Sequence, residues 1–351
     1  MLDENRTAKI ISVATVVPKY KINQDDVVKL AARVFGASMS DFSRLATVYG
    51  NAAIKTRYSC VPLEWYDKPC PFSERNRLYQ ENAVNLLAEA GQKALEKANL
   101  SFDDIDGLVV VSSSGIATPS LDAMLMEKLH LKRNMERLPI FGLGCVGGVV
   151  GLARTAQLAR GAPDKRYLYM VVELCGLDFI HSDCTKSNVI ATALFADGAA
   201  AAVISCKGDG PAIVGWGEHT WPDSLDVMGW DVSDDGLRVI FSQDIPTIVR
   251  KDMRQVVDKF LASQKLEIKD IAEFLCHPGG AKVIDAIEAA LDLPTGRLHY
   301  ARDILRNYGN MSAATVMFVL EEGLKSPRAG HTLLSSFGPG FTAGLVLLEV
   351  P

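Results

Sequence analysis

The chain has 351 residues, of which 48% are hydrophobic and 23% charged, and its formal net charge is −5. This composition excludes a disordered chain, and the length is enough for two units that each have their own core. The acidic balance, with no long basic run, excludes nucleic acid and anionic membrane surfaces as main partners.

Seven cysteines are scattered along the chain without a Cys-x-x-Cys pair. We therefore expect neither a disulfide framework nor a metal site, and a reducing cytoplasm as the setting. The first six residues are polar and acidic, so we expect no signal peptide, and no apolar run approaches the ~18 residues of a membrane span. These features predict a soluble cytoplasmic protein.

The first part of the chain predicts alternating strands and helices. In order, we expect a strand over 8–15, helices over 24–37 and 40–50 that begin after Asn23 and at Ser40, an irregular stretch over 54–78, a helix over 80–98, a strand over 108–111 and a helix over 120–130. Arg44, Lys55 and Arg57 lie near one another in this part. Solvated surface charge is one interpretation, and the mouth of a site for a phosphate-bearing ligand is the other.

A glycine-flanked cysteine follows. Residues 137–141 predict a buried strand, and the apolar spacing after Gly148 predicts a helix, so Cys145 lies in the turn between them. Glycines allow this turn to bend sharply, and the N–H groups at a helix N-terminus favour a thiolate. Cys145 is therefore a candidate nucleophile, and a small inert core residue is the alternative.

The rest of the chain continues the alternation. We expect strands over 167–172 and 199–204, a helix over 186–194, a connection over 207–235, a helix over 244–264, a strand over 271–276, helices over 281–291 and 311–323, and strands over 331–336 and 342–349. Trp216, Trp221 and Trp230 are expected to pack the connection, and the alternative is that one of them lines a substrate tunnel.

The two halves repeat each other. Residues 104–110 match 270–276 at an offset of 166, while Gly144-Cys145 matches Gly309-Asn310 and strand 166–172 matches 331–337 at an offset of 165. This near-constant offset predicts two pseudo-symmetric α/β units packed sheet to sheet, with residues 1–206 and 236–351 as the halves and 207–235 as the connection.

The duplication also predicts a site. It places Cys145 and Asn310 in equivalent strand–helix turns and His277 at the end of the strand equivalent to 108–111. In that arrangement His277 can accept the thiol proton, and His277 and Asn310 can both donate to an oxyanion. Two such donors suit an enolate, and hence carbon–carbon bond formation. The alternatives are a buried His277 satisfied by the backbone and Asn310 as a helix cap.

Five motifs together resemble one family. Gly-Cys145-x-Gly-Gly, Phe195-Ala-Asp-Gly-Ala-Ala, Cys-His277-Pro-Gly-Gly, Tyr-Gly-Asn310-Met-Ser-Ala and Phe337-Gly-Pro-Gly resemble, in order and spacing, the type III polyketide synthases of the chalcone-synthase-like family. The resemblance implies an α/β, thiolase-like duplicated αβαβα five-layer fold of two pseudo-symmetric halves. It implies an acyltransferase in which Cys145 carries the acyl chain, while His277 and Asn310 stabilise the enolate from decarboxylated malonyl-CoA. No cofactor is implied, because CoA thioesters are the substrates.

The resemblance also implies roles around this centre. Phe195 matches one gate phenylalanine, and Val239 replaces the second, so the gate is smaller. Thr118 matches a residue that reaches the partner's cavity, which implies a homodimer. Arg44 matches one CoA-tunnel cation and Thr47 and Asn51 replace two others, so Lys55, Arg57 or Lys282 is expected to compensate. The remaining residues implied for the pocket are Ser113, Cys175, Ser312, Gly338 and Pro339. Gly279 and Gly280 are implied to bind CoA together with the cations.

The substrate is predicted less directly. The segment 228–237 looks like that of bacterial members which accept long-chain fatty acyl-CoA and make alkylpyrones or alkylresorcinols. Val239, with Cys175 nearby, leaves room for an acyl tunnel, and a short closed cavity would count against it. The ring type, pyrone or resorcinol, stays open. The alternatives are a single condensation of the ketoacyl-synthase III kind with a carrier protein, an acyl-cysteine hydrolase, and a non-enzymatic homologue.

Overall fold

The structure is a computed structural model that describes residues 6–36, 39 and 42–351. Residues 1–5, the expected helix end at 37 and the expected cap Ser40 lie outside the described residues.

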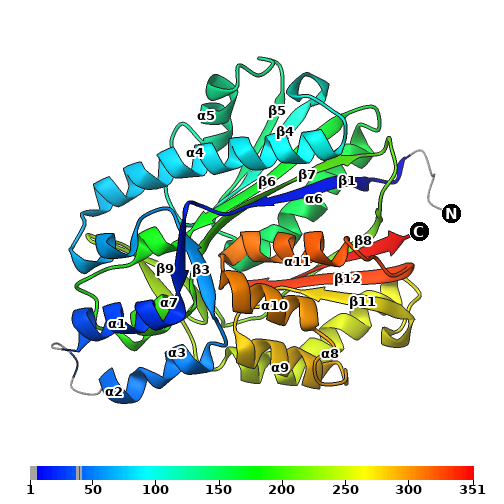
Figure 1. Ribbon diagram of the computed structural model, residues 1–351. Helices are drawn as coiled ribbons and strands as arrows, with labels where there is room; N and C mark the ends of the chain where they lie inside the picture. The colour runs from blue at the N-terminus through cyan, green and yellow to red at the C-terminus, as the bar shows by residue number, and fades with distance from the viewer. Residues whose placement is uncertain (1–5, 37–38, 40–41) are drawn as a thin grey trace.

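A mixed sheet runs through the whole molecule (Figure 1). In the described part of the chain its nine strands follow the order β11-β12-β13-β8-β1-β7-β6-β4-β5. These strands are β1 Lys9–Val16, β4 Gly107–Val111, β5 Glu136–Ile140, β6 Arg166–Leu174, β7 Asp197–Ser205, β8 Ala212–Thr220, β11 Ile271–Cys276, β12 Gly330–Gly338 and β13 Thr342–Val350. Two separate ribbons pair β2 Tyr20–Asn23 with β3 Thr56–Ser59, and β9 Met228–Ser233 with β10 Gly236–Phe241.

The sheet consists of two similar halves joined at one corner. Strands β4 and β6 are parallel and β6 and β7 antiparallel, and β11, β12 and β13 repeat this pattern. The halves meet between β1 and β8, where Ile10 N–H donates to Pro211 O at 3.0 Å and Ile213 N–H donates to Ala8 O at 2.8 Å. The predicted duplication is therefore present, and it extends to the strand pairs β7/β13 and β1/β8.

Helices form three layers around the two half-sheets (Figure 1). The described helices are α1 Gln24–Phe35, α2 Phe42–Leu45, α3 Thr47–Asn51, α4 Phe72–Lys97, α5 Leu121–Lys128, α6 Gly147–Gly161, α7 Lys186–Leu194, α8 Ile245–Ser263, α9 Ala281–Ala290, α10 His299–Tyr308 and α11 Thr315–Gly323. Helix α4 covers the outer face of one half-sheet, α8 and α9 cover the outer face of the other, and α6 and α11 lie between them.

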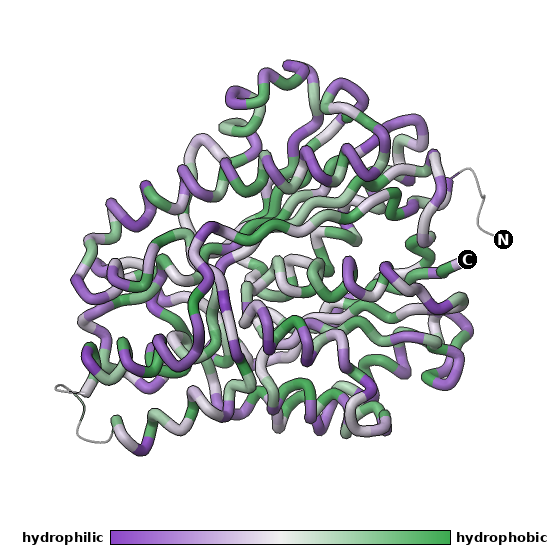
Figure 2. The backbone as a smooth tube through the Cα atoms, viewed as in Figure 1, coloured by the Kyte–Doolittle hydropathy of each residue, from purple (hydrophilic) through white to green (hydrophobic). Residues whose placement is uncertain are grey.

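Side-chain alternation along the strands produces this layering. On β6, Tyr167, Tyr169 and Val171 face the central cluster around α6 and α11, while the intervening side chains from Leu168 to Val172 face α4. Figure 2 shows the result as apolar central strands beneath outer helices with polar outer faces. The five-layer α/β arrangement is therefore the one that the sequence predicted.

Three predicted segments differ in the first half of the chain. Helix α4 begins at Phe72 rather than near 80, because Pro71 stands at its N-cap and the chain is helical directly after it. The expected helix over 40–50 is two short helices separated at Ala46. Strand β5 was expected to be buried, but it lies at the edge of the sheet with its side chains partly exposed.

The predicted connection is also more ordered than expected. Residues 207–235 contain β8, which pairs with β13 within the second half-sheet, and β9 of the outer ribbon. Helix α10 had no counterpart among the predicted elements, although it carries the turn that leads to Asn310.

Candidate active site

Cys145 lies in a strained turn at the beginning of α6. The chain leaves β5, turns through Gly142 and Gly144 with φ of +86° and +48°, and enters a short 3₁₀ turn, Gly144–Val146. These left-handed conformations favour glycine. The Cys145 side chain is 7% exposed and lies one turn before the N-terminus of a fifteen-residue helix.

Close packing brings this turn against the other half of the chain. A Cβ at Gly148 would lie 2.2 Å from the carbonyl oxygen of Ala313, so only glycine permits this approach. Ser312 precedes Ala313, and the Cys145 thiol donates to the Ser312 hydroxyl with 3.5 Å between Sγ and Oγ. Ser312 itself has a φ of +45°, a strained value for a non-glycine residue.

Asn310 is held from both ends of its amide. Its Oδ1 accepts from the Ser312 backbone N–H at 2.8 Å, and its Nδ2 donates to the Gly279 carbonyl at 3.2 Å. Its backbone pairs with the segment around Phe195, which lies beside it as an isolated bridge. The turn that holds Asn310 follows helix α10 rather than a strand, which corrects the expected strand–helix turn.

His277 follows β11 with a buried and unpartnered ring. The side chain is 3% exposed, and neither Nδ1 nor Nε2 has a hydrogen-bond partner in the described part of the chain. Its backbone N–H donates to Ser335 O, and Gly279 N–H donates to the His277 carbonyl. Contacts thus run from Cys145 through Ser312, Asn310 and Gly279 to His277. An imidazole with two open nitrogens is ready to bind a ligand.

Burial keeps the thiol and the imidazole neutral in the free site. It raises the pKa of Cys145 to about 12, an effect that the Ser312 hydrogen bond opposes. Burial likewise lowers the pKa of His277 to about 3. Both shifts arise because a low-dielectric environment disfavours a single isolated charge.

Ser113 joins the cysteine turn to a buried carboxylate. Its Oγ accepts from Gly144 N–H at 3.1 Å, and its own N–H donates to Glu173 Oε2 at 3.0 Å. Burial raises the pKa of Glu173 to about 7, with hydrogen bonds from Ser113 and Ser114 opposing the shift. Glu173 was not among the predicted residues. A single charge inside the apolar run 167–174 was the available signal.

An apolar cavity adjoins this centre at Phe195, whose backbone pairs with Asn310. Phe195, Val239 and Cys175 line it, as expected, and it continues to the apolar face of α1. Trp230 lines it as well, although the sequence favoured a packing role for that residue. Cys145, His277 and Asn310 are not among the lining residues.

The loop after β12 covers the cysteine turn. A Cβ at Gly338 would lie 2.4 Å from Leu143 O, and the Pro339 ring packs where a Cβ of Gly144 would lie. Gly338 and Pro339 therefore pack against the cysteine turn, and their role in a cyclisation pocket stays a prediction. Thr118 is exposed on the loop after β4 and is not among the residues that line the cavity.

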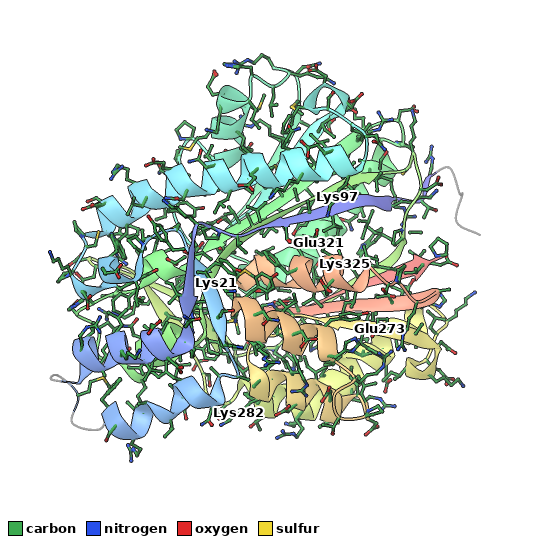
Figure 3. All side chains as sticks on the ribbon, viewed as in Figure 1. Lys21, Lys97, Glu273, Lys282, Glu321 and Lys325 are labelled. Atoms are coloured by element: carbon green, nitrogen blue, oxygen red, sulfur yellow. The ribbon has the colours of Figure 1, made fainter. Side chains whose placement is uncertain are left out.

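The expected CoA-binding cations separate into two groups. Arg57 is only 5% exposed, and its guanidinium donates to the carbonyls of Thr192, Ala193 and Phe195 and to the Gln24 side chain. It is thus a structural residue that holds the segment before Phe195, which corrects its expected role. Arg44, Lys55 and Lys282 are exposed, and Figure 3 shows Lys282 between α3 and α9. Gly279 and Gly280 form the backbone between His277 and α9.

The described residues contain neither a cluster of metal ligands nor a membrane-spanning helix. No cluster of three His, Cys, Asp or Glu side chains there could hold a metal ion. Likewise, none of the described helices is both long enough and apolar enough to cross a membrane.

Comparison with known proteins matches nearly the whole chain. Residues 3–208 match the N-terminal domain of chalcone and stilbene synthases, and residues 217–351 match their C-terminal domain. The chain belongs to this family, the type III polyketide synthases. It is therefore an acyltransferase with a thiolase-like fold.

Individual relatives agree with this assignment. The chain is 38% identical to a putative chalcone synthase of Bacillus subtilis, over 97% of this chain and 98% of the relative. It is 36% identical to a 1,3,6,8-tetrahydroxynaphthalene synthase of Streptomyces peucetius, over 98% of this chain and 94% of the relative. The solved structure of a 1,3,6,8-tetrahydroxynaphthalene synthase from Streptomyces coelicolor superposes with a TM-score of 0.93 at 24% identity, covering 97% of this chain and 99% of that chain. This likeness supports the fold.

Proposed function

We propose that this polyketide synthase loads a long-chain aliphatic acyl group from acyl-CoA onto Cys145 and extends it repeatedly with malonyl-CoA. The polyketide then cyclises to an alkylpyrone or an alkylresorcinol. The observation that carries the catalytic part is the junction of the two halves, where the Cys145 thiol contacts Ser312 and Asn310 faces the Gly279 carbonyl beside His277. The reaction needs no cofactor beyond the CoA thioesters.

The first step is acyl loading. Burial disfavours a lone thiolate or a lone imidazolium, but proton transfer from Cys145 to His277 creates both charges together, and each stabilises the other. The thiolate attacks the acyl-CoA carbonyl, the bond to the CoA sulfur breaks, and the CoA thiolate takes the proton back from His277.

The second step forms the carbon–carbon bond. Malonyl-CoA loses CO₂, and the electron pair of the broken bond moves to the thioester oxygen as an enolate. A His277 ring N–H and the Asn310 Nδ2 donate to that oxygen, with Nδ2 leaving its contact to Gly279 O. The enolate carbon attacks the Cys145-bound carbonyl, the sulfur is expelled, and the lengthened chain is held as its CoA thioester. Its return to Cys145 starts the next cycle.

The apolar cavity supports a long aliphatic starter. It extends from Phe195 and Val239 to the side chains of α1, and Val27, Leu30 and Phe35 form that end. Two of the charged groups that line it are bound to the backbone: Arg57 donates to carbonyls, and the Asp197 carboxylate accepts from the N–H groups of Cys60 and Gly176. A hydrocarbon chain placed there gains free energy from burial at about 0.8 kcal/mol per methylene.

Exposed cations near the segment that follows His277 support CoA binding there. Lys282 lies two residues beyond Gly280 and is exposed, as are Lys55 and Arg44. Ala52 and Ile54, next to Lys55, belong to the same hydrophobic cluster as Val283 of α9. We place the CoA phosphates against these three cations, with the Gly279-Gly280 backbone lining the arm that leads to His277.

Exposed apolar side chains support a homodimer. Ile116 is 43% exposed and Phe141 62% exposed, and both follow the ends of the paired strands β4 and β5 at the sheet edge. Thr118 lies two residues beyond Ile116. A second copy seated on this edge would cover these side chains and bring Thr118 towards the partner.

Product analysis tests the proposed function. Purified protein would receive malonyl-CoA with acetyl-, octanoyl-, dodecanoyl- or hexadecanoyl-CoA, beside a Cys145→Ala variant, and mass spectrometry would follow the products. Alkylpyrones or alkylresorcinols from the long starters, absent in the variant, are expected, and their masses give the number of extensions and the ring type.

Other product patterns identify the alternatives. Release of free fatty acid with malonyl-CoA left intact would identify a hydrolase, and a single β-ketoacyl product would identify a one-step condensing enzyme. Formation of 1,3,6,8-tetrahydroxynaphthalene without incorporation of the acyl starter would refute the long-chain starter alone.

A further inference from the structure

The indole of Trp230 bridges to the strand end that holds the cysteine turn. Its Nε1 donates to the Ser113 carbonyl with 2.9 Å between the two atoms. Ser113 in turn accepts from the N–H of Gly144, the residue before Cys145. A side chain of the outer ribbon is thus hydrogen-bonded to a residue that touches the catalytic turn.

The same indole forms part of the cavity wall together with Phe195. The ring centroids of Trp230 and Phe195 lie 6.5 Å apart, and both rings line the apolar cavity. Phe195 is bridged through its backbone to Asn310. Each ring thus lines the cavity and also belongs to a residue bonded to the catalytic centre, Phe195 through Asn310 and Trp230 through Ser113.

Trp230 lies on a two-stranded ribbon, opposite a small side chain. Trp230 is directly opposite Val239 in the β9–β10 pairing, so both side chains project from the same face. Valine is small, and the ribbon has no third strand in the described part of the chain. A two-stranded ribbon is only marginally stable by itself, so its tethers to the body of the protein decide its position.

We propose that Trp230 is a movable partition that controls which starter chains reach the apolar cavity, and that the indole–Ser113 hydrogen bond holds it closed. A long aliphatic chain on Cys145 enters the cavity only after this bond breaks and the indole turns away, whereas a short acyl group needs no such movement. This inference rests on the proposed function, which it deepens by assigning a specificity-determining residue.

Competition between starters tests the partition. Trp230→Phe keeps a ring but removes the donor, and Trp230→Ala removes the ring. Trp216→Phe is the matched control, because Trp216, a residue of β8, stacks against the Arg160 guanidinium and does not line the cavity. The readout is the ratio of kcat/KM for dodecanoyl-CoA to kcat/KM for acetyl-CoA. We expect Trp230→Phe to raise this ratio about threefold to tenfold, the effect of losing one neutral hydrogen bond. Trp230→Ala should raise it at least as much, and Trp216→Phe should leave it unchanged.

A binding measurement separates this inference from the proposed function. In a Cys145→Ala background, which cannot be acylated, dodecanoyl-CoA should change the tryptophan fluorescence, and Trp230→Phe should abolish that change while Trp216→Phe retains it. A response that survives Trp230→Phe, or no response in the parent, would overturn the partition.

The two failures therefore look different. If no polyketide forms but the fluorescence change still depends on Trp230, the proposed function fails and the partition stands. If polyketides form but both Trp230 variants keep the parent's starter ratio, the partition fails. Because Trp230→Phe preserves most of the side-chain volume, the test does not depend on whether Trp230→Ala folds.

Discussion

The Sγ of Cys145 lies 3.5 Å from the Oγ of Ser312, and this hydrogen bond joins the two halves of the duplicated chain at the catalytic turn. It depends on Gly148, whose missing side chain lets α6 approach Ala313 of the second half. Burial raises the pKa of this thiol to about 12, and the Ser312 hydroxyl opposes that rise. The reactivity of Cys145 should therefore depend on a residue of the other half.

Ser312→Ala should slow alkylation of Cys145. Loss of the hydroxyl raises the thiol pKa further, so at pH 8 we expect the rate with iodoacetamide to fall about fivefold, as for loss of one hydrogen bond of about 1 kcal/mol. Mass spectrometry of the peptide containing Cys145 measures the rate, and exposed Cys184 in the same sample is the internal control. Equal slowing at Cys184, or no slowing at Cys145, would contradict the assignment.

Asn310→Asp should reduce condensation far more than acyl loading. The carboxylate keeps the acceptor for the Ser312 N–H but removes the Nδ2 donor and adds a negative charge facing the enolate. We expect kcat for condensation to fall roughly 10²-fold to 10³-fold, the usual effect of losing one oxyanion donor. Acylation of Cys145, followed by intact-protein mass spectrometry, is the control and should change little. A loss shared equally by both steps would argue for a purely structural Asn310.

Glu173→Gln should change the pH dependence of stability. Burial raises the pKa of Glu173 to about 7 from its ordinary value of about 4.5, so the native state binds more protons than the unfolded state between those pH values. The contribution of this group is thus complete below about pH 4.5 and is lost as the pH rises to about 7, a difference of about 3 kcal/mol. The variant, which does not titrate, should gain stability relative to the parent from pH 5 to pH 8. Urea unfolding at both pH values measures this, and parallel curves would refute it.

Arg57 and Lys282 should respond in opposite ways to substitution. Arg57→Leu leaves the carbonyls of Thr192, Ala193 and Phe195 without their donor, so we expect a loss of about 3 kcal/mol or more in unfolding free energy. Lys282→Ala removes an exposed cation and should change stability by less than about 0.5 kcal/mol. It should instead raise KM for CoA substrates, and added salt should narrow the difference from the parent. A stable Arg57→Leu protein with a raised KM would restore Arg57 to the CoA site.

Local patterns in the sequence were sufficient for much of the fold. Continuous apolar runs and helical spacing predicted β4, β6, α7, α8 and β11 within one or two residues, because strands covered on both faces are apolar throughout and helices repeat their apolar face every turn. The glycines around Cys145 predicted its turn, since backbone with a positive φ favours glycine. The internal repeat predicted two pseudo-symmetric halves, and the motifs around Cys145, His277 and Asn310 predicted the family.

Other features depended on tertiary contacts that no local pattern records. The sequence alone could not show that Arg57 is buried among carbonyls of α7. The residues next to it in sequence are the same whether its side chain is buried or exposed, and its partners lie far along the chain. Strand β8 lies in a stretch rich in glycine and tryptophan that shows no strand pattern, because its pairing with β13 is what stabilises it as a strand. Glu173 and Trp230 acquire their roles from partners about 60 and 117 residues away in sequence. The sequence determined which residues could do the chemistry, because residue type and local turns are properties of the chain itself. Only the tertiary structure decided which of them are buried, paired or placed along the cavity, since burial and pairing belong to contacts between distant segments.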